Sequence, residues 1–120
     1  MNNTIDMEVV QELLDICDDG DTSLITDLIE MFLADGRERV NQVQTGIANA
    51  DLETVERAAH SLKGSAGNLG ATELMNIAED MQNASRGGDA ERVQELGPLM
   101  ATQYDAAAEA LSALRSRFGG

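Results

Sequence analysis

Apolar residues recur along the chain at the three- and four-residue spacing that places side chains on one face of an α-helix. The longest such stripe occupies positions 25, 29, 32, 36, 40, 43 and 47. A continuous stripe of this length, with polar residues around the rest of the helix, is typical of a helix in a bundle. Runs in which apolar and polar residues alternate, as in a half-buried strand, are missing. The pattern therefore predicts an all-α protein.

Turn residues divide this pattern into five segments. The predicted helices cover about residues 7–18, 22–49, 51–68, 72–86 and 89–117 of a single domain, 1–120. Asp6 and Thr72 are suited to cap the first and fourth helices, since a short side-chain oxygen can accept a free backbone N–H. The third helix is expected to open at Asp51. Pro98 should bend the last helix or divide it, because proline lacks the N–H that a helix interior needs. Short loops make consecutive helices antiparallel, so we expect an up-and-down antiparallel four-helix bundle with a short additional N-terminal helix.

Charge narrows the classes of partner. The 120 residues include 22 Asp and Glu against 8 Lys and Arg, which gives a formal net charge of −14. A protein that binds nucleic acid or an anionic membrane needs a basic surface, and the sequence offers none. No run approaches the roughly 20 apolar residues that span a bilayer, and the first residues do not resemble a secretory signal. A single Cys17 suits a reducing compartment, so we expect a cytoplasmic monomer. One Cys and one His cannot form a zinc cluster, and no metal site is expected.

The most unusual local feature is the pairing of His60 with Lys63, which are the single histidine and the single lysine of the chain. At about 100° per residue, the apolar stripe of helix 51–68 is centred near 230° from His60, so the imidazole should point away from the core. Gly64 and Gly67 share its face, although each glycine costs a helix about 1 kcal/mol relative to alanine. Position alone favours an ordinary surface histidine beside a fraying helix end. The grouping on one face favours a site that something approaches closely.

The segment His60–Ala71, HSLKGSAGNLGA, resembles the motif of histidine-containing phosphotransfer (HPt) domains. That motif reads His, any residue, Leu, Lys, Gly, two small residues, two variable residues, an aliphatic residue and Gly. The order of a small leading helix, a long second helix, a histidine-bearing third helix and two further helices is also similar to that family.

The resemblance implies a role for each matching residue. His60 is the implied phospho-acceptor, a nucleophile that attacks through Nε2. Lys63 then pairs with the phosphoryl group, and Gly64 leaves room for that group and for a loop of the partner.

Other residues are expected to support this site. Gln82 and Arg86 match polar and basic positions of the family, and their spacing from His60 places them on the facing fourth helix. Arg57 and Gly67 share the helix face of His60. Ser65 is a candidate to hold the imidazole through a hydrogen bond to Nδ1.

The resemblance also implies the partners. The expected function is to relay a phosphoryl group between the aspartates of response-regulator receiver domains, with a hybrid sensor histidine kinase as a further partner. The chain needs no cofactor of its own, because the receiver supplies Mg²⁺ during transfer. Two alternatives stay open: the phospho-accepting domain of a hybrid or chemotaxis-type kinase, and an interaction module whose histidine is never phosphorylated. The Met1 start favours a stand-alone protein, although the excised end of a hybrid kinase fits equally well.

The first helix and the start of the second are apolar on two sides. One interpretation is that Val10, Leu14, Leu24 and Leu28 face solvent in part and form a docking patch for a receiver beside His60. The other is that each helix covers the apolar stripes of its neighbour.

Overall fold

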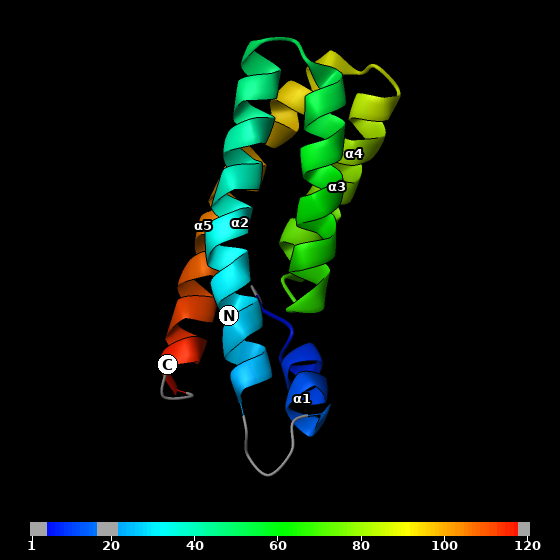
Figure 1. The fold of residues 1–120 in the computed structure, drawn as a ribbon. Helices are drawn as coiled ribbons and strands as arrows, with labels where there is room; N and C mark the ends of the chain where they lie inside the picture. The colour runs from blue at the N-terminus through cyan, green and yellow to red at the C-terminus, as the bar shows by residue number, and fades with distance from the viewer. Residues whose placement is uncertain (1–4, 17–21, 118–120) are drawn as a thin grey trace.

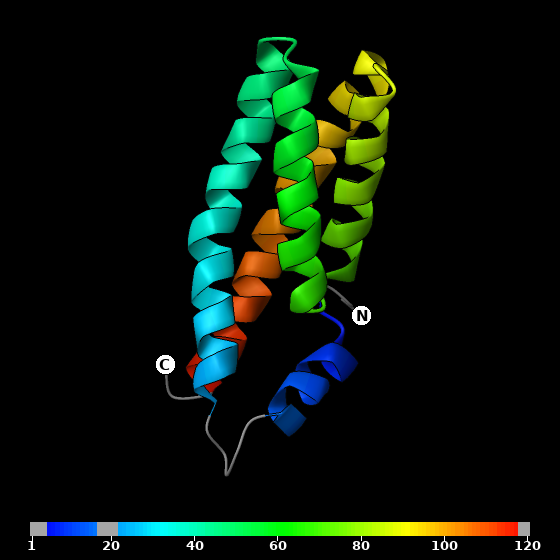
Figure 2. The ribbon, with the colours of Figure 1, turned by 45° about the vertical axis from the view of Figure 1, so that its right-hand side comes forward.

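The computed structural model describes residues 5–16 and 22–117, which form five α-helices. The helices are α1 (Met7–Ile16), α2 (Ser23–Ala48), α3 (Leu52–Asn68), α4 (Thr72–Arg86) and α5 (Ala90–Arg117). Helices α2 to α5 form an antiparallel bundle in which each contacts two neighbours, and α1 lies at the end where α3 passes into α4 (Figure 1). Turned by 45°, the bundle shows α5 crossing behind α2 and α3 (Figure 2). The predicted fold class is confirmed; the predicted end of the first helix, at residue 18, lies outside the described residues.

The predicted Asp6 cap is present and Asp51 is a further cap. The predicted Thr72 cap is wrong, since Thr72 is the first residue of α4 and follows the N-cap residue Ala71. Asp6 Oδ1 accepts a hydrogen bond of 3.0 Å from the backbone N–H of Glu8 at the start of α1. Asp51 accepts from both the hydroxyl group of Thr54, at 2.7 Å, and its backbone N–H, at 3.2 Å. The hydroxyl contact is the main reason that the pKa of Asp51 lies below its ordinary value. The Asp51 cap therefore fixes the start of α3, the helix that carries His60.

Pro98 does not divide α5, so of the two alternatives, a bend or a division, the division is wrong. The helix runs without interruption from Ala90 to Arg117. A proline at position 98 frees the carbonyl group of Gln94 from its helical hydrogen bond. Both residues are exposed, so water can satisfy that carbonyl and the interruption costs little.

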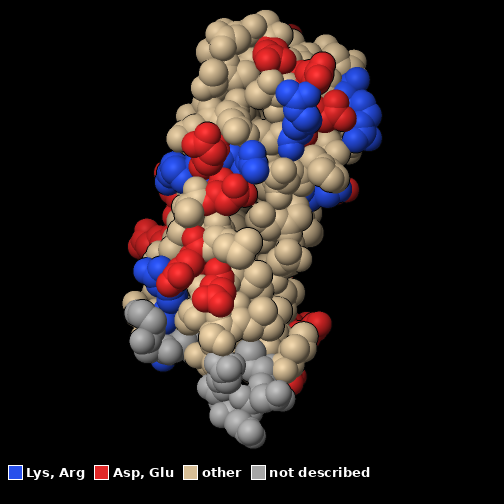
Figure 3. All heavy atoms as spheres, viewed as in Figure 1, with Lys and Arg blue, Asp and Glu red and all other residues tan. Residues whose placement is uncertain are grey.

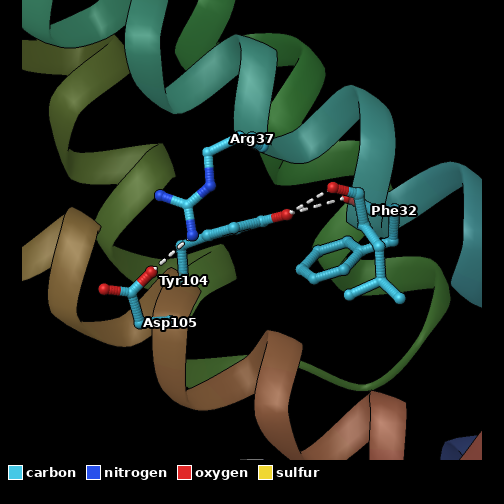
Figure 4. Close-up of polar contacts among 5 residues, drawn as sticks. Phe32, Arg37, Tyr104 and Asp105 are labelled. Carbon is cyan, nitrogen blue, oxygen red and sulfur yellow. Dashed lines mark hydrogen bonds and ion pairs between the residues drawn. The ribbon is translucent and has the colours of Figure 1, made fainter.

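A tyrosine fastens α5 to α2 (Figure 4). The hydroxyl group of the buried Tyr104 donates a hydrogen bond that is shared between the backbone oxygens of Phe32, at 3.2 Å, and Leu33, at 3.0 Å. Its ring stacks on the Phe32 ring with 5.2 Å between centroids. Gly36 makes the close approach possible, because a Cβ there would lie 2.6 Å from Tyr104 Cε1. The glycine within the long apolar stripe thus allows α5 to pack closely on α2.

Two charged residues, Arg37 and Asp105, lie on the solvent side of the contact between Tyr104 and α2. The Arg37 guanidinium carbon lies 4.7 Å above the centre of the Tyr104 ring, within the range of a cation–π interaction. Arg37 also pairs with Asp105 at 2.7 Å. Burial raises the pKa of Tyr104 above its ordinary value of 10.0.

The other apolar residues of the long stripe on α2 are buried, apart from the half-buried Ile47. Ile25, Ile29, Phe32, Val40 and Val43 are buried in the core. None of the helices within 5–16 and 22–117 is both long enough and apolar enough to cross a membrane.

Candidate functional site

His60 lies on the solvent face of α3 and is exposed, as the helical wheel predicts. It borders an open depression between α3 and α4. The lining residues are Glu56, Arg57, His60, Ser61, Gln82 and Arg86. Figure 3 shows basic and acidic side chains side by side over the part of the bundle where α3 begins and α4 ends. The histidine therefore lies in a charged but nearly compensated surface.

Gln82 is the direct partner of the imidazole. Its Nε2 lies 3.0 Å from Nδ1 of His60, across the α3–α4 contact. Only 7% of the Gln82 residue is exposed, so its amide is held by packing. The resemblance implied that Gln82 supports the site from α4, and the structure places its amide at the ring nitrogen of His60.

Ser65 does not make the hydrogen bond predicted for it. Its hydroxyl donates to the backbone oxygen of Ser61 at 3.2 Å, one turn earlier in α3. A serine inside a helix commonly satisfies its hydroxyl in this way. Nδ1 of His60 is held by Gln82 instead.

The contact with Gln82 can serve either tautomer of the imidazole. When the amide nitrogen donates to Nδ1, the ring proton is on Nε2. When the amide is turned by half a rotation, its oxygen accepts from Nδ1–H and the lone pair is on Nε2. In both cases one ring nitrogen is held by the protein and Nε2 stays available to solvent or a partner.

Two of the nearby cations reach across to acidic side chains on the other helix. Arg86 Nε lies 3.0 Å from Glu56 Oε2, one helical turn from His60. Lys63 Nζ lies 3.9 Å from Glu79 Oε1. Both predicted supporting cations thus already have a carboxylate partner across the α3–α4 contact.

Arg57 is paired within α3. Its Nη1 lies 2.6 Å from Glu53 Oε1, in a pair four residues apart on an exposed face. Arg57 also lines the depression beside His60. Arg57 therefore lies beside the depression, as predicted for a supporting residue. Its guanidinium is paired with Glu53, one helical turn before Arg57 in α3.

Comparison with known proteins agrees with this geometry. The family model of the Hpt domain matches residues 27–116. The chain belongs to the Hpt domain family. It is 29% identical over 79 residues to the phosphorelay intermediate protein YPD1 of Candida albicans, a match that covers 66% of this chain and 42% of that protein. The resemblance read from the segment around His60 is confirmed.

The fold of this Hpt domain also matches a solved structure. The histidine-containing phosphotransfer protein B (HptB) of Pseudomonas aeruginosa PAO1 superposes with a TM-score of 0.87 at 22% sequence identity. The superposition covers 98% of each chain. The likeness therefore includes the small leading helix as well as the bundle.

The glycines of the Hpt motif have different structural reasons. A Cβ at Gly64 would meet nothing within 4 Å, so the surface beside His60 is open there. A Cβ at Gly67 would lie 3.0 Å from Met75 Sδ, and this glycine therefore lets α3 pack closely on α4. Gly70 has φ of +76°, and its Cβ would lie 2.7 Å from the backbone oxygen of Asp6. Gly64 alone of the three keeps space open for an incoming group.

Gly70 also joins the motif to α1. The backbone N–H of Asp6 donates to Gly70 O at 2.7 Å, immediately before α1 begins. The last glycine of the motif thus fixes the small helix against the end of the helix that carries His60.

The predicted docking patch is only partly exposed. Val10 is buried in the core of the Hpt domain, so its assignment to a solvent-facing patch is wrong. The second interpretation, that neighbouring helices cover these apolar stripes, therefore holds for Val10. Leu14 and Leu28 are half-buried, and Leu24 is 41% exposed.

A shallow groove between α2 and α3 extends this apolar surface. It is lined by Leu28, Met31, Phe32, Asp35, Ser65, Asn68 and Leu69. Met31 is 65% exposed and was not among the predicted docking residues. The α3 residues of the groove follow His60 by one to two helical turns, about 8–12 Å along the helix. The exposed large apolar residues of α2 are therefore Leu24 and Met31.

No cluster of three or more His, Cys, Asp or Glu side chains within the described ranges is arranged to hold a metal ion.

Proposed function

We propose that this Hpt domain carries a phosphoryl group on His60 and relays it between aspartates of receiver domains in two-component signalling. The observation that carries the proposal is the pairing of an exposed His60 with a buried Gln82 at Nδ1. Family membership supports the same function. With the Gln82 amide turned so that its oxygen accepts from Nδ1–H, this arrangement orients the imidazole and leaves the Nε2 lone pair free for an incoming phosphorus atom.

The proposed transfer balances as a simple displacement. The lone pair on His60 Nε2 attacks the phosphorus of a receiver aspartyl phosphate; an N–P bond forms while the P–O bond to the aspartate breaks, which releases the carboxylate. The ring then carries a positive charge, with its proton on Nδ1. The side-chain oxygen of Gln82 accepts a hydrogen bond from Nδ1–H and so stabilises the charged ring. Transfer to the next receiver reverses these steps.

Nearby cations offset the charge that arrives. A phosphomonoester carries about −1.5 to −2 at neutral pH, and we expect a similar charge on phosphohistidine. On a chain of net charge −14 that addition is unfavourable overall. Lys63 and Arg86 lie near enough to lower the cost locally, within the Debye length of about 8–10 Å.

The partner proposed here is a receiver domain, which approaches over the open surface at Gly64 and contacts the apolar residues Leu24, Leu28 and Met31. The receiver brings Mg²⁺, and the Hpt domain needs no cofactor of its own. A hybrid sensor histidine kinase is a further proposed partner. We propose that the chain acts as a monomer in the cytoplasm, where such receivers occur.

The proposal is tested by phosphoryl transfer from a panel of receivers labelled with ³²P on aspartate. The native chain should acquire a label that is labile in acid and stable in base, and His60→Gln should acquire none. If the native chain binds receivers but is labelled by none of them, it is an interaction module and the proposed function is wrong.

A further inference from the structure

Two neighbouring side-chain contacts join α3 to α4. One joins His60 to Gln82 and the other joins Glu56 to Arg86, each at 3.0 Å. Glu56 precedes His60 by four residues on α3, and Arg86 follows Gln82 by four residues on the antiparallel α4. The two contacts are therefore about 6 Å apart along the helices. At that separation a charge on one contact acts on the other.

The ion pair compensates Arg86 before any phosphoryl group arrives. Glu56 Oε2 accepts from Arg86 Nε, so the guanidinium is drawn toward α3 one turn before His60. A phosphoryl group on His60 would compete with Glu56 for the same guanidinium and would be repelled by the Glu56 carboxylate. Both effects have the same sign, because each makes phosphorylated His60 less favourable.

We propose that Glu56 is a positioning residue that weakens the hold of the site on the phosphoryl group. Glu56 retains Arg86 while His60 is free, and Arg86 exchanges from Glu56 to the phosphoryl group when His60 is modified. This exchange raises the free energy of the phosphorylated form and favours onward transfer over storage. The inference rests on the proposed function, since it concerns the same histidine.

Glu56 is better placed for this role than the other acidic neighbours. Its side chain is 32% exposed, compared with 55% for Glu79 and 78% for Glu53. The Glu79 contact with Lys63 is longer, at 3.9 Å. The Glu53 pair stays within α3 and leaves α4 untouched. Glu56 therefore combines the least exposed carboxylate of the three with the shorter of the two pairs that reach α4.

The test compares Glu56→Gln with Glu109→Gln, which makes the same change in net charge at an exposed position of α5. The chain and a labelled receiver are brought to equilibrium, and the ratio of phosphorylated chain to phosphorylated receiver is measured at low concentration. Glu56→Gln should shift this ratio toward the chain by about twofold to tenfold, given the size of electrostatic effects between partly exposed groups. Glu109→Gln should leave it near the native value. An equilibrium ratio is used because it does not depend on how fast the proteins dock.

A second measurement asks whether the effect passes through Arg86. In an Arg86→Gln background the shift caused by Glu56→Gln should become smaller, since the guanidinium is no longer there to exchange. In ³¹P NMR, the phosphoryl group of the Glu56→Gln chain should lose its second proton at lower pH than in the native chain. A merely structural role for Glu56 would move neither result.

The outcomes separate this inference from the proposed function. If the native chain accepts no label, the proposed function fails. If the native chain accepts label but Glu56→Gln matches Glu109→Gln in both equilibrium and ³¹P titration, only the role of Glu56 fails. Circular dichroism monitors folding of the variants, and Glu56→Ala replaces Glu56→Gln in both measurements if the glutamine variant is unfolded.

Discussion

The side-chain amide of Gln82 lies 3.0 Å from Nδ1 of His60 and joins the buried face of α4 to the exposed face of α3. We expect Gln82→Leu to slow phosphoryl transfer to His60 about tenfold, because a hydrogen bond to a group of developing charge contributes about 1.5 kcal/mol. Rapid-quench transfer from a labelled receiver measures the rate. Asn83→Ala, on the exposed neighbouring position, is the control and should transfer at the native rate. Equal rates in Gln82→Leu and native protein would show that the imidazole needs no partner at Nδ1.

Substitution of Gly64 should have opposite effects on the stability of the folded chain and on the rate of phosphoryl transfer. Alanine meets nothing within 4 Å there, so Gly64→Ala is expected to stabilise the folded chain by about 0.5–1 kcal/mol, through better helix propensity. The added methyl group would nevertheless occupy the open surface beside His60 and slow transfer from a receiver. Urea denaturation and transfer kinetics on the same preparation check both effects. A variant that is more stable and transfers at the native rate would show that the open space serves no partner.

The contact between α1 and the end of α3 can be measured with two glycines. Gly70 and Gly88 have nearly the same φ, +76° and +75°, but a Cβ at Gly88 meets nothing within 4 Å. Gly88→Ala should therefore lose only the energy of the strained backbone, of the order of 1 kcal/mol. Gly70→Ala should lose at least a further ~1 kcal/mol, because its methyl group also collides with Asp6 and displaces α1. Equal losses in urea denaturation would mean that α1 contributes nothing to stability through this contact.

Tyr104 gives a spectroscopic readout of the contact between α2 and α5, because it is the only tyrosine and the chain has no tryptophan. Burial raises its pKa above 10.0 in the folded chain, so the unfolded chain loses this proton first. The contribution of Tyr104 to stability is thus complete below about pH 10 and is lost as the pH rises toward the folded pKa. Absorbance at alkaline pH should show a later ionisation in native protein than in urea. Tyr104→Phe should lose less stability than native protein over that range.

Docking should depend on the exposed apolar residues of α2 and not on exposed apolar residues elsewhere. Leu24→Ser with Met31→Ser should weaken binding of a cognate receiver about tenfold or more, since burying such side chains contributes roughly 1–2 kcal/mol each. Leu99→Ser removes a comparably exposed side chain from α5 and should leave affinity unchanged. Isothermal titration calorimetry compares the variants. If Leu99→Ser were as damaging as the double variant, the receiver would dock on a different face.

Periodicity predicts this fold well because burial repeats locally along each helix. The stripe from position 25 shows which side of α2 faces the core, and the wheel shows that His60 faces outward. The family follows from the residues around His60, which are contiguous in sequence. Each of these inferences needs information from one helix only.

Contacts between helices depend on register, which periodicity does not specify. Whether Gln82 meets the imidazole or an outer phosphoryl oxygen is decided by how α4 slides along α3, and the close packing at Gly67 helps to set that position. The same uncertainty hid the pairing of Glu56 with Arg86. Val10 was misplaced for a related reason, because two apolar stripes on a short helix do not reveal which one a neighbour covers.

The fit of Tyr104 over Gly36 constrains how related sequences can change. A side chain at position 36 and a large ring at position 104 exclude one another, since the Cβ would enter the ring. We therefore expect the two positions to covary among Hpt domains that share this contact, with a smaller residue at 104 wherever 36 is not glycine. These residues are 68 positions apart and lie outside the histidine motif, so this pair offers a sequence signature for subdividing the family that the phosphotransfer site does not contain.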